Sequence, residues 1–302
     1  MLVLDAGNAL FKGPAPEDPR GQERALFLLE QMDALGTSAM AVGTRDLALG
    51  TDFLLKGAKG RKMKLLSANL VDAQGKTLFA ASTVVAVGGV KFGLVGVSPE
   101  GPVSTQKGVV GQPALRAAIT EARRLKTKDK VDVVVVLAAL NYPQAVELSE
   151  QAGDAMDFIL QSANGQSSSM AQRNNLAVLI PSGDRGRQVM RLALSVEGSG
   201  PFVDVSEADR ALQNLKIIDA NLEQARKSLA AARDPVLRRT WEDNIATFEG
   251  RRQQLLQQTQ GSKGAPKRTQ ALSPIALGPD VPSDEETKKN VERIDPLGAA
   301  SH

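Results

Sequence analysis

Residues Val131 to Leu140 read VDVVVVLAAL, a short and continuous run of branched apolar side chains. The run shows neither helical spacing nor the alternation of a strand with one wet face. Such a run is typical of a β-strand covered on both faces, in the middle of a packed sheet. The sequence therefore predicts a layered α/β fold around this strand. In such folds the chemistry usually lies at the carboxyl ends of the strands, yet Ala138, Ala139 and Leu140 supply no ligand, acid, base or nucleophile there.

Strand-like and helical stretches alternate on both sides of this run. Strands are expected at residues 1–5, 38–42, 64–70, 157–160, 176–181 and 188–196. A Gly88-Gly89 turn is typical of a β-hairpin that joins residues 77–87 to 90–97. Helices are expected at residues 21–35, 47–56, 113–128 and 142–151. This alternation predicts a mixed sheet domain over residues 1–203.

The composition changes after residue 203, and two further segments follow. Residues 206–260 are rich in Ala, Leu, Glu, Gln and Arg and predict an antiparallel helical hairpin, which we interpret as a self-packed arm in preference to a dimerisation surface. Asp234 and Pro235 are typical of the cap and first position of its second helix. The seam is formed by Leu215, Ile218, Leu222, Ala225, Leu229 and Ala232, and then by Trp241, Phe248 and Leu255. Residues 261–302 predict a mostly disordered tail with a short helix at 284–293.

Composition excludes several classes of function. The 302 residues include no cysteine, which excludes disulfides and thiolate chemistry, and one histidine, His302, at the end of the chain. The net charge of +3 and the lack of a basic stripe with interleaved aromatics argue against nucleic acid as a partner. The basic stretch 56–64 is interpreted as a solvated loop in preference to a phosphate-binding patch. No apolar run reaches the length of a membrane span, and no signal peptide precedes the first strand, so the compartment stays open.

A series of motifs in a fixed order points to a family. The series comprises LVLDAGNAL (2–10), LGTSAMAVGTRDLALGTDFL (35–54), LLSANLVDAQGKTLFAASTVV (65–85), GGVKFGLVGVSPE (88–100), DVVVVLAAL (132–140), MDFIL (156–160) and IPSGDRGRQVMRLALSV (180–196). Together these motifs resemble the N-terminal calcineurin-like metallophosphoesterase domain of the bacterial 5′-nucleotidase family, over about residues 1–203. The resemblance implies a four-layer αββα sandwich, with two divalent metals at the strand ends that hydrolyse phosphoric esters. Members of this family are usually periplasmic or exported.

The positions that resemble the family's metal ligands carry other residues here. The bridging aspartate falls on Asn8, the asparagine and histidine of the second motif fall on Thr44 and Arg45, the histidine of the central strand falls on Ala139, and the last two histidines fall on Ala163 and Gly165. The family's first strand and its Asp-x-His motif would lie upstream of Met1 and are expected to be missing. Divalent cations need charged or imidazole ligands to offset their dehydration. We therefore expect no metal cofactor and no catalytic residue.

Three hypotheses follow for the function. The first is a degenerate 5′-nucleotidase-like protein that serves as a binding or scaffold module, with Arg45 binding an anionic small molecule and residues 206–260 binding a protein partner. The second is residual phosphoester hydrolysis from a rebuilt site at Asp5, Asn8, Arg45 and Asp46. The third is a gene product truncated by a wrong start. Within the first two, Arg45 and Asp46 are also candidates for a structural ion pair.

Overall fold

The computed structural model describes residues 1–15, 19–103, 108–162, 172–173, 175–181, 186–259, 267–278 and 280–296. The chain forms two compact units, Met1–Arg191 with Ser273–His302, and Leu192–Leu272. Their boundaries lie inside two strands, β13 (Gln188–Val196) and β15 (Arg268–Ala276). This division differs from the boundary that the change in composition suggested at residues 203–206.

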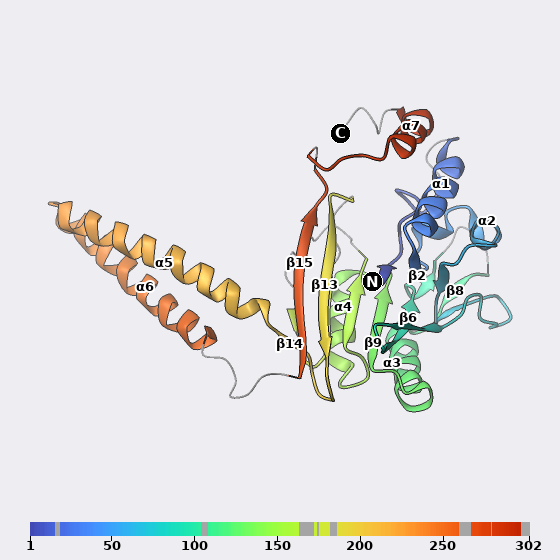
Figure 1. Ribbon diagram of the computed structural model, residues 1–302, viewed down its shortest axis with the longest axis horizontal. Coiled ribbons are helices and arrows are strands. Elements are labelled where there is room, and N and C mark those ends of the chain that lie inside the picture. The colour runs from blue at the N-terminus through green and yellow to red at the C-terminus, as the bar shows by residue number, and fades with distance from the viewer. Residues whose placement is uncertain are drawn as a thin grey trace. The chain divides into compact units, whose positions relative to one another are not determined.

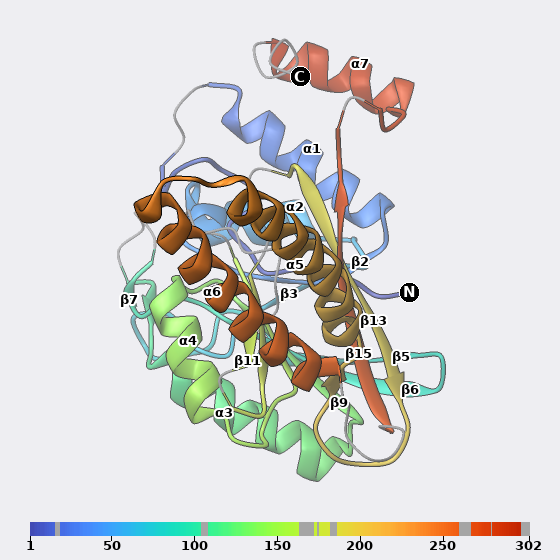
Figure 2. The same ribbon diagram turned by 90° about the vertical axis from the view of Figure 1, so that its left-hand side faces the viewer.

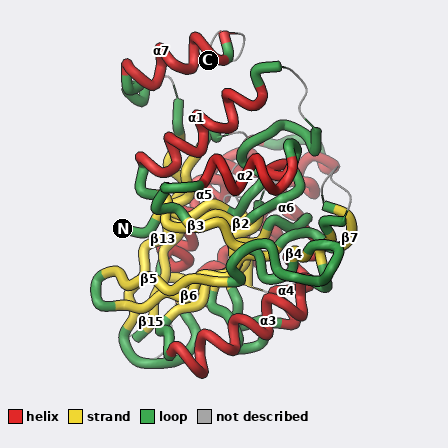
Figure 3. The backbone as a smooth tube through the Cα atoms, turned by 90° about the vertical axis from the view of Figure 1, so that its right-hand side faces the viewer, coloured by secondary structure: helices red, strands yellow, loops and turns green. Residues whose placement is uncertain are grey.

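A six-stranded sheet forms the centre of the first unit, in the order β11-β12-β10-β9-β6-β5. Its strands are β5 (Ser82–Val87), β6 (Val90–Val97), β9 (Val133–Ala138), β10 (Phe158–Gln161), β11 (Gln172–Arg173) and β12 (Val178–Pro181). β9 lies between β6 and β10, pairs with both in parallel, and buries all six of its residues. The expectation of a central strand covered on both faces is therefore confirmed. The expected hairpin is also present, since β5 and β6 pair antiparallel up to Val87 and Val90 (Figure 3).

A second, three-stranded parallel sheet packs face to face on the first. It consists of β1 (Val3–Asp5), β2 (Thr37–Ala41) and β3 (Lys64–Leu66), with β2 in the middle. The two sheets approach closely at Gly96, where an added Cβ would lie only 2.3 Å from the carbonyl oxygen of Leu66. Glycine is therefore needed at this position of β6, because any side chain would push the sheets apart.

Helices cover the outer faces of both sheets. α1 (Gly21–Ala34) contacts β2 and α2 (Gly50–Ala58), while α3 (Ala114–Arg124) and α4 (Tyr142–Gln151) contact the large sheet. Figure 1 shows α1 and α2 on one side of the first unit and α3 and α4 with the large sheet. Alternate residues of β9 divide between the layers, since Val134 and Val136 join the apolar cluster shared with α3 and α4. These layers form the αββα arrangement that the family resemblance implied.

The strand expected at residues 64–70 is broken into β3 and β4 (Leu70–Val71) by buried polar side chains. Asn69 donates from Nδ2 to the carbonyl of Ser98 at 2.8 Å, and its Oδ1 accepts the N–H of Ser98. The hydroxyls of Ser67 and Ser98 lie 2.8 Å apart. This network satisfies the backbone where the chain leaves one sheet for another. β4 then pairs with β8 (Val110–Gly111), which also pairs with β7 (Gly101–Pro102).

Two long helices in the second unit form the expected hairpin, and they run side by side in Figures 1 and 2. They are α5 (Ser206–Ala231) and α6 (Pro235–Thr259). The Asp234 carboxylate accepts the N–H of Val236 at 2.7 Å, which confirms the predicted cap. The buried seam contains Ala211, Leu215, Ile218, Leu222, Ala225 and Leu255. Among the described residues, no helix is long and apolar enough to cross a membrane.

The tail differs from the disorder expected for most of residues 261–302. Residues 268–276 form β15, which lies between β13 and β14 (Val203–Asp204) in a three-stranded sheet. Residues Glu285–Ile294 form α7, capped by Asp284, which confirms the short helix expected there. α7 lies beside α1 in Figures 1 and 3, and its Ile294 is 2% exposed. One strand with alternating burial and one buried isoleucine are hard to recognise in a Pro- and Gly-rich sequence. The composition of the tail therefore predicted less regular structure than the chain forms.

Candidate functional site

The carboxyl ends of β1, β2, β9 and β10 lie close together and define the candidate site. β1 leads into residues 6–10, β2 leads into residues 42–47, and Ala139 and Ser162 follow β9 and β10 directly. β1 pairs in parallel with β2, and β9 pairs in parallel with β10, so within each pair the strand ends and the following loops share one edge. The residues that follow these strands in the sequence are therefore brought together by the fold as expected.

Asn8 connects three of these loops. Its φ of 63° lies in the left-handed region that asparagine tolerates better than most residues. The side-chain amide donates from Nδ2 to the hydroxyl of Ser162 at 2.9 Å, and Oδ1 accepts the backbone N–H of Arg45 at 3.1 Å. An added Cβ at Gly43 would lie 2.3 Å from Asn8 Oδ1, so only glycine leaves room for the amide. Asn8 therefore acts here as a bridge between loops.

Asp46 is the centre of the same loops and is fully buried. Its carboxylate accepts backbone N–H groups from Asn8, Ala9 and Leu10 at 2.7, 2.9 and 3.1 Å, and from Gly43 at 2.8 Å. Burial raises the pKa of Asp46 to about 7, although the N–H donors oppose the shift, and the Asp5 carboxylate adds to it. The expected ion pair with Arg45 does not form: among the described residues, the partners of this carboxylate are backbone amides.

Asp5 ends β1 beside this centre. Its Oδ1 accepts the N–H of Gly7 at 2.7 Å, and Gly7 has a φ of 89°. Burial raises the pKa of Asp5 from its ordinary value, and the Gly7 hydrogen bond partly offsets the shift. The Asp5 side chain is half-buried, in contrast to Asp46.

The remaining expected positions contribute no ligand within the described part of the chain. Ala139 is 2% exposed, and its methyl group would lie 3.2 Å from a Cβ at Gly7, so the first loop packs directly over the end of β9. Thr44 precedes the short 3₁₀ helix Arg45–Leu47. Arg45 is half-buried, and its guanidinium forms no ion pair among the described residues. Ala163 and Gly165 lie outside the described residues.

Two features of the site were missed at the sequence level. Ser162 receives the Asn8 amide, and Gln161, 1% exposed, donates to the carbonyl of Leu140 at 3.0 Å. Gln161 ends β10 and Ser162 follows it, in the polar stretch QSANG. No sequence spacing in this stretch distinguishes a residue that bridges two loops from an ordinary loop residue. The sequence suggests Asp46 as a partner of Arg45 or as a member of a rebuilt hydrolytic site. It gives no sign of the hydrogen bonds to backbone amides, because backbone donors are the same at every residue.

The described side chains at this edge offer few of the ligands that a pair of divalent metals needs. Such a pair needs several anionic or imidazole donors that point at the cations. Here the fully buried carboxylate of Asp46 faces four N–H groups, the Asn8 oxygen accepts another, and Ala139 offers a methyl group. Within the described ranges, no three His, Cys, Asp or Glu side chains are grouped so that they could hold a metal ion.

Comparison with known proteins shows which of them share this fold. No family model matches the chain. An apyrase from Tabanus yao is 28% identical over 134 residues, which span 43% of this chain and 24% of the apyrase. Among solved structures, the 5′-nucleotidase precursor of Thermus thermophilus aligns with a TM-score of 0.52 and 24% identity, over 63% of this chain and 41% of that one.

Two further structures share the fold at lower identity. The calcineurin-like phosphoesterase YfkN from Bacillus subtilis aligns with a TM-score of 0.54 and 17% identity, over 66% of this chain and 72% of that one. The sulfate thiohydrolase SoxB of a Thermus species aligns with a TM-score of 0.54 and 22% identity, over 64% of this chain and 35% of that one. The chain thus spans under half the length of the apyrase and of the Thermus 5′-nucleotidase. It has the metallophosphoesterase fold of 5′-nucleotidases and calcineurin-like phosphoesterases.

Proposed function

We propose that the chain is a degenerate 5′-nucleotidase-like module that keeps the αββα scaffold but does not hydrolyse phosphoesters through metals. The observation that supports this proposal is that the side-chain oxygens at the strand ends are already occupied by hydrogen bonds to the backbone. Asn8 stands at an expected ligand position and Asp46 is next to Arg45 in the sequence, and both accept hydrogen bonds from backbone amides of the site loops. Groups that hold the loops in this way are unavailable to a cation unless the loops open.

The test combines metal content with turnover. The purified protein, dialysed against Mn²⁺ and then freed of excess ion, is expected to retain far less than one metal per chain. It is also expected to hydrolyse p-nitrophenyl phosphate no faster than the buffer with Mn²⁺. An Asn8→Ala variant prepared in parallel identifies contaminating phosphatase, whose activity would not depend on residue 8. Stoichiometric metal with turnover that Asn8→Ala abolishes would contradict the proposal.

The binding role that we propose centres on Arg45. Arg45 is half-buried as a residue and forms no ion pair among the described residues, so no neighbouring carboxylate neutralises its charge. Arginine binds carboxylates and phosphates through two parallel hydrogen bonds. A small anion such as a phosphate ester or a carboxylate would therefore suit this position.

Binding is measured as a shift of the thermal midpoint on titration with inorganic phosphate and adenosine monophosphate. A ligand at about 100 times its dissociation constant stabilises the folded state by about 2.7 kcal/mol. Arg45→Ala is expected to lose the shift. Arg116→Ala is the matched control, because Arg116 is an exposed arginine of α3 and its loss should leave the shift intact. Equal shifts in both variants would rule out Arg45 as the anion site.

A second candidate is metal-independent hydrolysis by the rebuilt set Asp5, Asn8, Arg45 and Asp46. The observation that favours it is the raised pKa of the two carboxyl groups, as a general acid requires. The burial of Asp46 opposes it, since a fully buried carboxyl cannot reach a substrate, whereas Asp5 retains some exposed surface. Turnover in the presence of a chelator that Asp5→Asn abolishes would favour this candidate over the first.

A further inference from the structure

The two edges of the α5–α6 hairpin differ in their charges. One edge holds three ion pairs: Arg226 with Glu249 at 2.8 Å, Arg252 with Asp219 at 2.7 Å, and Lys227 with Glu223 at 2.6 Å. Two of these join the helices to each other. The groove along this edge is therefore lined by charges that are already satisfied within the hairpin.

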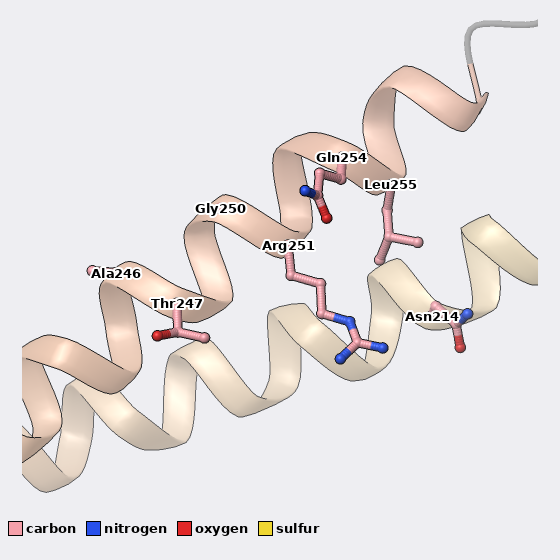
Figure 4. A pocket seen from close by; sticks show the side chains of 7 residues that line it. All are labelled: Asn214, Ala246, Thr247, Gly250, Arg251, Gln254 and Leu255. Carbon is pink, nitrogen blue, oxygen red and sulfur yellow. The ribbon is translucent and has the colours of Figure 1, made fainter.

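The opposite edge carries a groove of about 610 Å³ with little charge. Figure 4 shows its lining, which is Asn214 from α5 with Ala246, Thr247, Gly250, Arg251, Gln254 and Leu255 from α6. An added Cβ at Gly250 meets nothing within 4 Å, so the backbone of α6 is open to close approach there. Thr247 donates its hydroxyl to the carbonyl of Asp243 at 2.9 Å, and this hydroxyl stays satisfied if the groove is covered.

A second seam runs along this edge of α6. Its members step by four and three, as in helices that pack along their length: Val236, Thr240, Asp243, Thr247, Gly250 and Gln254. Val236 is 75% exposed although it is aliphatic. This stripe lies on a different side of α6 from Ile245, Phe248 and Leu255, which pack on α5.

The charges on this edge are arranged so that two copies of the edge, packed antiparallel, bring opposite charges together. Asp243 lies four residues before Thr247 and Arg251 lies four residues after it. Two α6 helices that pack antiparallel about a twofold axis at Thr247 place Asp243 of each copy opposite Arg251 of the other. Both side chains are exposed, and among the described residues neither forms an ion pair within its own chain.

We propose that the groove lined by Thr247 and Gly250 is the site where α6 packs antiparallel on α6 of a second copy of this chain. The two α6 helices then lie side by side, each with its own α5 on another side, and Gly250 allows close contact of the two backbones. This proposal goes beyond the function proposed for the αββα unit and does not depend on it. It departs from the self-packed arm that the sequence favoured.

A cysteine at the twofold axis tests the geometry directly, because the chain has no other cysteine. Oxidation of Thr247→Cys is expected to produce a disulfide-linked dimer in most of the full-length protein, since identical residues face each other only at the axis. Gln253→Cys is the matched control: residue 253 lies on the ion-paired edge of the same helix, and this variant should stay unlinked. Equal cross-linking of the two variants, or none in either, would overturn the proposal.

A charge exchange tests the pairing without a covalent link. Asp243→Arg or Arg251→Asp alone puts like charges opposite each other at two places and is expected to weaken the dimer by about tenfold or more. The double variant Asp243→Arg/Arg251→Asp restores both pairs and is expected to recover the affinity of the original chain. Sedimentation velocity over a range of concentrations measures all four proteins. A monomeric original chain, unaffected single variants, or a double variant without recovery would each contradict the pairing.

A large side chain placed in the groove distinguishes loss of the dimer from loss of the fold. Gly250→Leu fits the isolated hairpin, because the position is open and leucine favours a helix more than glycine does. The variant is expected to keep its helical circular dichroism, become monomeric, and melt no earlier than the original chain when both are monomeric. A dimer that survives this variant forms elsewhere on the chain and would refute the proposed site.

Discussion

Asp46 shows how a single buried side chain fixes the candidate site. Its carboxylate joins residues 8–10 to the start of the next loop through four backbone N–H groups. Those donors lose their acceptor if the carboxylate is removed, and buried donors without partners are costly. The same contacts hold Asn8 at its positive φ and place its amide between Ser162 and Arg45. The arrangement of the site loops therefore depends on Asp46 more than on any residue at an expected metal position.

Asp46→Asn is expected to lower the free energy of unfolding by about 3 kcal/mol at neutral pH, because an amide cannot accept four hydrogen bonds and its NH₂ group opposes some of the donors. Urea unfolding followed by far-ultraviolet circular dichroism measures the loss. Asp52→Asn, at an exposed carboxylate in α2, is the control and should change stability by less than about 0.5 kcal/mol. Similar losses in the two variants would mean that Asp46 holds no loops together.

The raised pKa of Asp46 also predicts how this contribution changes with pH. The folded-state pKa of about 7 lies above the unfolded value of 3.8, so the folded protein binds the proton more tightly. Stability from this carboxyl is therefore greatest in mild acid and decreases as the pH rises from about 4 to about 7, with no further change above. Because asparagine does not titrate, the stability difference between the original chain and Asp46→Asn should be larger at pH 5 than at pH 8. A difference that grows with pH would show that the four N–H donors outweigh burial.

At the scale of elements, α7 shows how the tail is held to the first unit. Ile294 is 2% exposed, Thr287 donates to Gln31 at 3.3 Å, and Arg293 forms an ion pair with Glu23 of α1. The ion pair is exposed and contributes little, so the apolar contact carries most of the docking energy. Helix α7 is thus attached through one buried side chain near its end.

Ile294→Ala is expected to release α7, since loss of a buried isoleucine costs about 2–4 kcal/mol and a short helix is not stable alone. Limited digestion with trypsin should then cut at Lys288, Lys289 and Arg293 several times faster than in the original chain. Ile275→Ala is the control, because Ile275 in β15 is 45% exposed and its loss should not alter cleavage in α7. If α7 resists trypsin equally in both variants, its docking does not depend on Ile294.

At the scale of the whole molecule, the hairpin is an insertion between strands of one sheet. The chain leaves through β14 and returns through β15, and these two strands pair in parallel at Val203–Thr269 and Asp204–Gln270. Its exit and entry points are therefore close in space, which is the arrangement in which an inserted segment is tolerated. The αββα unit does not need residues of the hairpin to build its layers.

Replacement of residues 206–266 by a Gly/Ser linker of about eight residues is expected to leave the αββα unit folded, since such a linker spans about 15 Å. The shortened protein should lose helical circular dichroism in proportion to α5 and α6 and keep a cooperative thermal transition near that of the original chain. Phosphate binding through Arg45 should also persist. An unfolded or non-cooperative product would show that the hairpin is part of the folding unit.

The sequence by itself determined the layered architecture and the edge of the candidate site. The run Val131–Leu140 specifies a strand buried on both faces, because a continuous apolar stretch has no face left for water. Local signals likewise specified the Gly88-Gly89 hairpin and the start of α6 at Asp234 and Pro235. These elements are determined by residues that are close together in the sequence, so they can be predicted without knowledge of the fold. The positions of Asn8, Arg45 and Ala139 at one edge follow from the order of the strands.

Only the tertiary structure decided what the polar residues at that edge do. Asp46 follows Arg45 in the sequence and suggests an ion pair, but in the fold its partners are backbone amides. One of them is the nearby Gly43, and the other three lie 36 to 38 residues away. Ser67, Asn69 and Ser98 break a predicted strand because they meet across two sheets. The order of β15 and α7 arises from strands and helices that are distant in sequence. Hydrogen bonds and burial of this kind depend on contacts between segments that are distant in the sequence, and local sequence patterns do not predict those contacts.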